Sequence, residues 1–196
     1  MKKLLILFIL FFSYDSYSQE SATKEYDANY SFDRAKEFVL DSIMGNPGIN
    51  IKKIYIDGLP GEKHSELTSL YYNGSEKEGI VLGIFDKAVN ESGLPIWKHI
   101  FINFNREEAI FFFKTVNDIK NRERSYLGDK TKENHIYFKM KDITFLIYSD
   151  SGIRMKVFYK GFVSDWKGTS FERMHRSFER RIKQAFKGKI GDNIPH

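Results

Sequence analysis

The residues best suited to chemistry lie near the C-terminus, where Glu172, His175 and Glu179 follow one another at i, i+3 and i+7. Helical periodicity places all three on one side of a helix. A Glu-x-x-His pair can hold a divalent metal, but such sites need carboxylates from facing helices, and the sequence holds no second Glu-x-x-His. Each glutamate also precedes a cation, Arg176 or Lys183, by four residues, as surface ion pairs favour. We interpret the cluster as ion pairs and expect neither metal nor cofactor.

The same segment predicts a stripe of cations along one side of a helix. Its opposite side is apolar and suited to packing. The stripe could hold phosphate groups or an anionic lipid surface through charge and bidentate arginine contacts. The alternative is a solvated helix face. These candidate ligand-binding residues are Arg173, Arg176, Arg180, Lys183 and Lys187.

A second cationic surface is expected on a strand over residues 153–162. Alternation places Arg154, Lys156, Phe158, Lys160 and Phe162 on one face, which is both basic and aromatic, and the expected strand at 135–141 adds more lysines. Such a face can bind glycans or polyanions through stacking and charge. It can equally be the solvated side of an antiparallel sheet. The candidate residues are Arg154, Lys156, Phe158 and Lys160.

Familiar catalytic motifs are missing from the sequence. It contains no nucleophile elbow, zinc-binding His-Glu-x-x-His, phosphate-binding glycine loop or dinucleotide fingerprint. A similarity of Lys160-Gly161-Phe162 to the start of an RNA-recognition signature stops at Val163. We therefore favour a protein that is not an enzyme. The alternative is a small hydrolase whose site is assembled from separate elements, with His99 and His175 as first candidates.

Helical periodicity predicts three helices. The first begins at Ser31 and stops at Gly45, and the second runs from an Asn105 cap to about residue 121. The third runs from a Ser170 cap to about residue 187, before Gly188. The core stripe of the second helix is expected to be Ala109, Phe112, Phe113, Val116 and Ile119.

Seven strands complete the expected order α-β-β-β-β-α-β-β-β-α. A turn is expected at residues 57–61, and the strand at 96–104 is expected to be central because both of its faces are apolar. The fold class is α+β, with one antiparallel sheet of about seven strands and helices packed on one face. The strands are expected at residues 50–56, 66–72, 79–85, 96–104, 135–141, 143–148 and 153–162.

The N-terminus has the layout of a secretory signal peptide. Lys2-Lys3 precedes a nine-residue apolar run, and Ser16 and Ser18 suit cleavage after Ser18. The run is too short for a transmembrane helix, so no integral membrane span is expected. We predict a signal peptide at 1–18, a flexible lead-in at 19–30, one α+β domain at 31–188 and a tail at 189–196. The protein is then periplasmic or secreted.

Composition limits the remaining classes of function. The 196 residues are 41% hydrophobic and 29% charged and include no cysteine, which excludes a disordered chain, a disulfide scaffold and thiolate chemistry. We expect an exported, soluble cell-envelope protein that acts as a non-catalytic binding domain. An anionic envelope component or a protein is the expected partner, and no nucleic acid is expected. A structural subunit of an envelope assembly, with Phe111 at an interface, is a further alternative.

Overall fold

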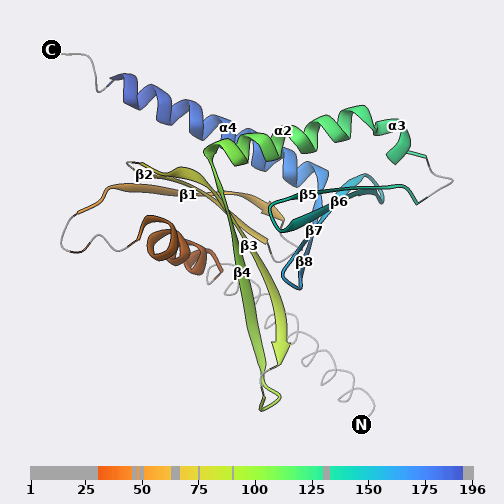
Figure 1. Cartoon of the computed structure of the whole chain (residues 1–196), viewed down its shortest axis with the longest axis horizontal. Helices are drawn as coiled ribbons and strands as arrows, with labels where there is room; N and C mark the ends of the chain where they lie inside the picture. The colour runs from red at the N-terminus through yellow and green to blue at the C-terminus, as the bar shows by residue number, and fades with distance from the viewer. Residues whose placement is uncertain are drawn as a thin grey trace, which may run out of the picture.

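The computed structural model describes residues 31–45, 48, 51–62, 67–74, 76–89, 91–129 and 133–191. The predicted signal peptide and lead-in lie outside the described residues, as do residues 192–196 of the predicted tail. The described chain forms two four-stranded antiparallel sheets with helices packed against them (Figure 1). The expected α+β class with antiparallel strands is therefore confirmed.

Each sheet follows the order of its strands along the chain. The first sheet contains β1 (Ile54–Glu62), β2 (Leu67–Gly74), β3 (Glu78–Val89) and β4 (Pro95–Asn105). The second contains β5 (His135–Met140), β6 (Ile143–Ser149), β7 (Ile153–Tyr159) and β8 (Phe162–Lys167). The first helix covers residues 31–38 and continues as the π-helix η1 (Val39–Met44). The other helices are α2 (Arg106–Arg122), α3 (Arg124–Leu127) and α4 (Gly168–Gly191).

The expectation of one seven-stranded sheet is wrong in two respects. The strands form two sheets, which divide between β4 and β5, and the segment at 153–162 is not one strand. Lys160 and Gly161 have φ angles of 47° and 84°, which is the left-handed conformation of a two-residue hairpin turn. The chain reverses there and forms β8, so Phe162 packs against the core instead of continuing the cationic face. Eight strands then divide into two units, each of four strands followed by a long helix.

The turn expected at residues 57–61 is also wrong, since β1 runs through it. Pro60 is exposed, and β1 is an edge strand, where a missing backbone donor is tolerated. Gly58 allows the Phe32 ring to lie close, since an added Cβ would stand 3.3 Å from it. The pairing with β2 shifts register between Leu59 and Glu62, so the glycine and proline residues bend the strand without ending it.

The strand expected to be central, β4, lies at the other edge of the first sheet. Both of its faces are nonetheless covered. Ile102 and Phe104 face the main core, and Phe101 faces the helix at residues 31–44, with Phe38 stacked on it at 5.0 Å. Apolar residues on both faces indicate two packed layers, and they do not indicate neighbouring strands on both sides.

One core joins the two sheets beneath α2 and α4. Helix α2 begins with the expected capping box between Asn105 and Glu108, and all five residues of its predicted core stripe are buried. Phe112 is central to this core, with its ring 5.2 Å from that of Phe104 in the first sheet and 5.1 Å from that of Phe145 in the second. Helix α4 closes the core through Phe171 and Phe178. The two long helices therefore cover the inner faces of both sheets.

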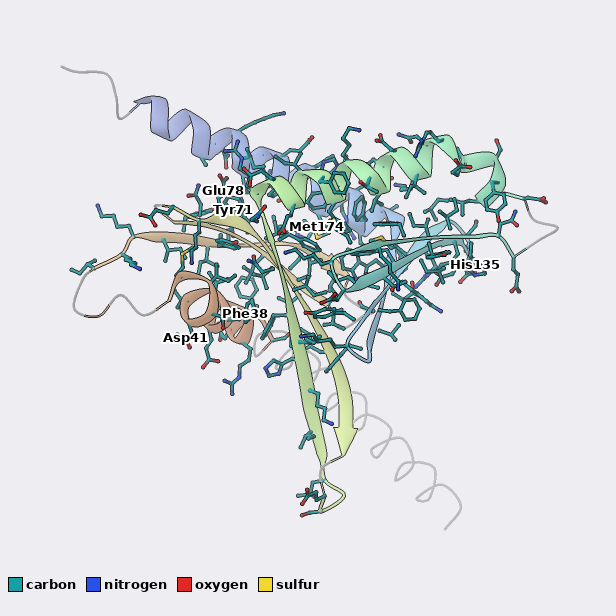
Figure 2. The ribbon with its side chains drawn as sticks, in the orientation of Figure 1. Phe38, Asp41, Tyr71, Glu78, His135 and Met174 are labelled. Atoms are coloured by element: carbon teal, nitrogen blue, oxygen red, sulfur yellow. The ribbon has the colours of Figure 1, made fainter. Side chains whose placement is uncertain are left out.

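The first helix packs on the opposite face of the first sheet, so the expectation that all helices lie on one face is wrong. Its buried residues, Ala35, Val39 and Ile43, form a second apolar cluster with Leu70 and Tyr72 of β2. Figure 2 shows Phe38 on this helix, on the side of the sheet away from Met174 of α4. The first sheet is thus covered on both faces.

Helix α4 begins before its expected cap. It starts at Gly168, whose missing Cβ lets Ile153 O approach, since an added Cβ would stand 2.8 Å from that oxygen. Ser170 consequently lies in the first turn, buried, and its hydroxyl accepts a hydrogen bond from Arg173 Nη2 at 3.0 Å. The helix also continues past the expected stop at Gly188 to Gly191.

Candidate functional site

The outer face of the second sheet is the surface best suited to binding a ligand. Strand register arranges its residues in three rows, each running across β5, β6, β7 and β8. The rows are His135-Tyr148-Arg154-Lys167, Tyr137-Leu146-Lys156-Asp165 and Lys139-Thr144-Phe158-Val163. These twelve residues are called the open face below, because α2, α3 and α4 contribute their buried side chains to the core on the other side of the sheet.

Several large side chains of the open face are exposed although they are apolar or aromatic. Tyr137 is 72% exposed, Val163 51% and Phe158 37%. Side chains in one row are about 4.8 Å apart between strands, and successive rows along a strand are about 7 Å apart. Tyr137 and Phe158 therefore lie within one small area together with Lys139 and Lys156. Figure 2 shows His135 at the outer end of this sheet.

A hydrogen-bonded network joins two neighbouring rows of the open face. The Tyr148 hydroxyl donates to Asp165 Oδ2 at 2.5 Å, and Arg154 Nε donates to Asp165 Oδ1 at 3.0 Å. Burial and the bond to Asp165 raise the pKa of Tyr148, and the same carboxylate raises the pKa of Arg154. The Lys156 ammonium lies 5.3 Å from the centre of the Tyr148 ring. Asp165 is the only carboxylate among the twelve residues, and two neighbours already engage it.

The structure divides the candidate residues from the 153–162 segment. Arg154, Lys156 and Phe158 lie on the open face as expected. Lys160 does not, because it occupies the β7–β8 turn with its ammonium 5.2 Å from the Tyr159 ring. Sequence reasoning missed Asp165 and Lys167, which β8 adds to the face. The signal for β8 was Lys160-Gly161, a two-residue turn between alternating segments.

The predicted stripe on α4 forms a separate surface. Arg173, Arg176, Arg180 and Lys183 are exposed on the side of α4 that faces away from the sheets, and the Lys187 side chain lies outside the described side chains. A shallow depression of about 460 Å³ lies among Arg176, Glu179, Arg180, Lys183 and Gln184. Since the open face points away from the helices, the candidate residues form two surfaces and not one site.

The cluster Glu172, His175 and Glu179 lies where α4 meets α2. His175 is half-buried, stacked on Phe113 at 4.6 Å, with Nδ1 2.8 Å from Asn117 Nδ2 and Nε2 3.5 Å from a Glu179 carboxylate oxygen. Burial lowers the pKa of His175. Glu172 forms an ion pair with Lys120 of α2, and Glu179 contacts His175. The pairs predicted for these two glutamates were instead with Arg176 and Lys183. The imidazole is held between helices rather than at the bottom of a pocket, and the arrangement joins α2 to α4.

Among the described residues, no three or more histidine, aspartate or glutamate side chains are grouped so that they could hold a metal ion. His99, the other histidine considered for a hydrolase, lies on the first sheet between Phe85 and Phe101, at 6.0 and 5.2 Å between ring centres. His99 and His175 therefore lie on different elements with different neighbours, and no contact joins them. Helices long and apolar enough to cross a membrane are not found in the described part of the chain.

Comparison with protein-family models, with curated proteins and with solved structures finds no match to this chain. The case for function consequently depends on the chemistry of the open face and of α4.

Proposed function

We propose that the protein is an exported, non-catalytic binding protein whose open face holds an acidic glycan of the cell envelope. The observation that carries this proposal is the placement of lysine and exposed aromatic side chains in adjacent rows on a sheet face that no described helix covers. The predicted signal peptide supports an envelope location, where acidic glycans are accessible and intracellular nucleic acids are not.

The charges of the open face favour an anionic ligand. Lys139, Lys156 and Lys167 come from three different strands and from three different rows. The open face therefore carries four cationic side chains, these three lysines and Arg154, against the single carboxylate of Asp165. A chain of anionic groups lying diagonally across the sheet can therefore meet one ammonium in each row.

The aromatic residues favour a sugar polymer over a small inorganic anion. Tyr137 and Phe158 expose ring surface that an inorganic anion leaves in water, whereas the C–H face of a sugar ring can cover it. Carboxylate or sulfate substituents of the same polymer can then reach Lys139 and Lys156. An acidic glycan uses both kinds of side chain at once.

Binding without turnover agrees with the chemistry of the face. Cleavage of a glycosidic bond by the usual mechanisms requires two carboxyl groups about 5 to 10 Å apart. The open face offers one, and that carboxylate accepts hydrogen bonds from Arg154 and Tyr148. The face can hold a polymer, but it lacks this pair of acid and base.

The test is binding of the full chain to immobilised polygalacturonate, an acidic polysaccharide, with neutral dextran as reference. The double variant Lys139→Glu/Lys156→Glu should lose at least about tenfold in affinity, which corresponds to about 1.4 kcal/mol. The matched control is Lys53→Glu/Lys98→Glu, which makes the same charge change at two exposed lysines of the first sheet region. This control should lose less than about twofold, since distant exposed charges are screened by salt.

Equal losses for the two double variants would contradict the assignment to the open face. Absence of binding to acidic polysaccharide by the unchanged protein would contradict the glycan proposal as a whole. Release of shortened oligosaccharides during the assay would contradict the non-catalytic assignment.

A further inference from the structure

Helix α4 contains a tandem repeat of seven residues. Residues 170–176 read SFERMHR and residues 177–183 read SFERRIK, identical in the first four positions and basic in the seventh. Seven residues make nearly two helical turns, so each residue type returns to almost the same side of the helix about 10.5 Å further on. The repeat therefore builds one surface pattern twice.

The structure gives the repeated residues the same roles in both copies. Phe171 and Phe178 enter the core, with ring centres 5.4 and 5.1 Å from that of Phe113. The buried hydroxyls of Ser170 and Ser177 accept hydrogen bonds from Arg173 Nη2 at 3.0 Å and Arg180 Nη2 at 3.4 Å. Each arginine is thus held by a serine of its own copy.

The two glutamates of the repeat make different contacts. Glu172 pairs with Lys120, and Glu179 lies 3.5 Å from His175 Nε2. The cations lie on the exposed side of α4, and Glu179 lies next to Arg176, Arg180 and Lys183 there. The exposed cations Arg173, Arg176, Arg180 and Lys183 are called the cationic comb below.

Two exposed apolar side chains lie on α2, the helix that packs against α4 through Phe113. The contacts between α2 and α4 run antiparallel, from Lys120 with Glu172 to Phe113 with Phe178. Ile110 and Phe111 precede Phe113 along α2, toward the end of this helix pair at which α4 carries Arg180 and Lys183, and they are 47% and 60% exposed. These two residues are called the apolar pair.

We propose that α2 and α4 together dock on the surface of an anionic lipid bilayer. The cationic comb contacts the lipid headgroups, and the apolar pair enters the edge of the hydrocarbon. Each cation near such a surface contributes attraction to anionic lipid, and each apolar side chain gains from leaving water. A soluble polyanion would engage the comb but would leave Ile110 and Phe111 in water. The apolar pair therefore favours a membrane.

This docking surface goes beyond the glycan site, because the two lie on opposite sides of the molecule. Helices α2 and α4 pack against the inner faces of the sheets, and the open face points the other way (Figure 1). A protein held on lipid by α4 and α2 would leave the open face accessible to a glycan.

The test is co-sedimentation of the full chain with vesicles of 30% phosphatidylglycerol in phosphatidylcholine, against vesicles of phosphatidylcholine alone. The unchanged protein should bind the anionic vesicles at least about tenfold more tightly. Arg176→Glu/Lys183→Glu should abolish that preference, whereas the controls Lys53→Glu/Lys98→Glu and Lys139→Glu/Lys156→Glu should keep it within about twofold. Circular dichroism and the melting temperature verify that each variant folds.

Phe111→Ser distinguishes a membrane from a soluble polyanion. This variant should lose about threefold or more in vesicle affinity while its binding to inorganic polyphosphate stays unchanged, because only the bilayer takes up the ring. Equal binding to both kinds of vesicle, no binding to either, or a loss in Arg176→Glu/Lys183→Glu with no loss in Phe111→Ser would overturn the proposal. The last result would assign the comb to a soluble polyanion.

Discussion

The two sheets of this protein have the same construction and differ in what covers their outer faces. Each is a four-stranded antiparallel meander followed by a long helix that packs on the inner face. On the first sheet, the outer face is apolar and lies under the helix at residues 31–44. On the second, the corresponding face consists of the lysine, tyrosine, threonine and other side chains of the open face.

Equivalent positions show how residue type follows from this cover. Leu70 and Tyr72 of β2 are completely buried, whereas Leu146 and Tyr148 of β6 lie in the same strand positions on their sheet and are only partly buried. Tyr148 bonds to Asp165 on its own sheet, while Tyr72 bonds to Asn103 beneath the first helix. The same pair of residues thus stabilises a packed layer in one sheet and forms part of a surface in the other.

The largest expected effect on stability comes from a charge placed between the first helix and the first sheet. Val39→Asp should lower the free energy of unfolding by about 4 kcal/mol, because Val39 is fully buried and an isolated carboxylate there has no partner. Leu40→Asp, at the next residue of the same helix but 45% exposed, should cost less than about 1 kcal/mol. Urea denaturation measures both, and similar values for the two would show that this helix does not cover the sheet.

A second comparison uses the two leucines on the outer faces. Leu70→Ala should cost about 3 kcal/mol, since it leaves a cavity between β2 and the first helix. Leu146→Ala should cost about 1 kcal/mol or less, because the open face closes over no cavity. The difference between the two free energies of unfolding, obtained from denaturant midpoints, measures how much the packing of the first helix contributes at this position. A cost at Leu146 as large as at Leu70 would mean that the second sheet is covered as well.

Much of this contrast could be predicted from the sequence, since it depends on local periodicity. The core stripe of α2, the end of the first helix at Gly45 and the cationic face of Arg154, Lys156 and Phe158 were all predicted from spacing alone. The tandem repeat in α4 was also readable, as the letters SFER recur after seven residues. Its roles became clear only with the contacts of both copies.

The sequence could not predict which element packs against each face of a strand. Apolar residues on both sides of β4 indicated a covered strand, but an edge strand between two layers has the same pattern as a central one. Gly58 and Pro60 predicted a turn. A strand is possible there because β1 is at the edge of the sheet and the Phe32 ring lies close to Gly58, and both facts depend on tertiary structure. Which surfaces meet is decided by packing between segments far apart along the chain.

A smaller effect is expected within the open face, where stability and binding should change in opposite directions. Asp165→Asn weakens the bonds from Arg154 and Tyr148 and should cost about 1 kcal/mol. It also removes the only carboxylate of the face, so affinity for polygalacturonate should rise by about twofold. Asp142→Asn, at the exposed β5–β6 turn, makes the same charge change and should alter neither quantity appreciably. A fall in affinity for Asp165→Asn would show that the carboxylate serves the ligand directly.

The smallest expected effect is a change in how stability depends on pH, and it belongs to the covered sheet. His99 Nδ1 is buried and, within the described residues, has no hydrogen-bond partner, and burial followed by the charge of Arg34 lowers the pKa of the ring from 6.5. The unfolded chain therefore binds a proton at a pH where the folded chain does not, so stability falls as the pH drops below about 6.5. His99→Phe should flatten this fall between pH 7 and pH 5, and the remaining slope should include His175, whose pKa burial also lowers. At pH 8 both imidazoles are neutral in either state, so any difference measured there reports packing alone. If the dependence of stability on pH is unchanged in His99→Phe, the His99 ring takes up its proton as readily in the folded protein as in the unfolded chain.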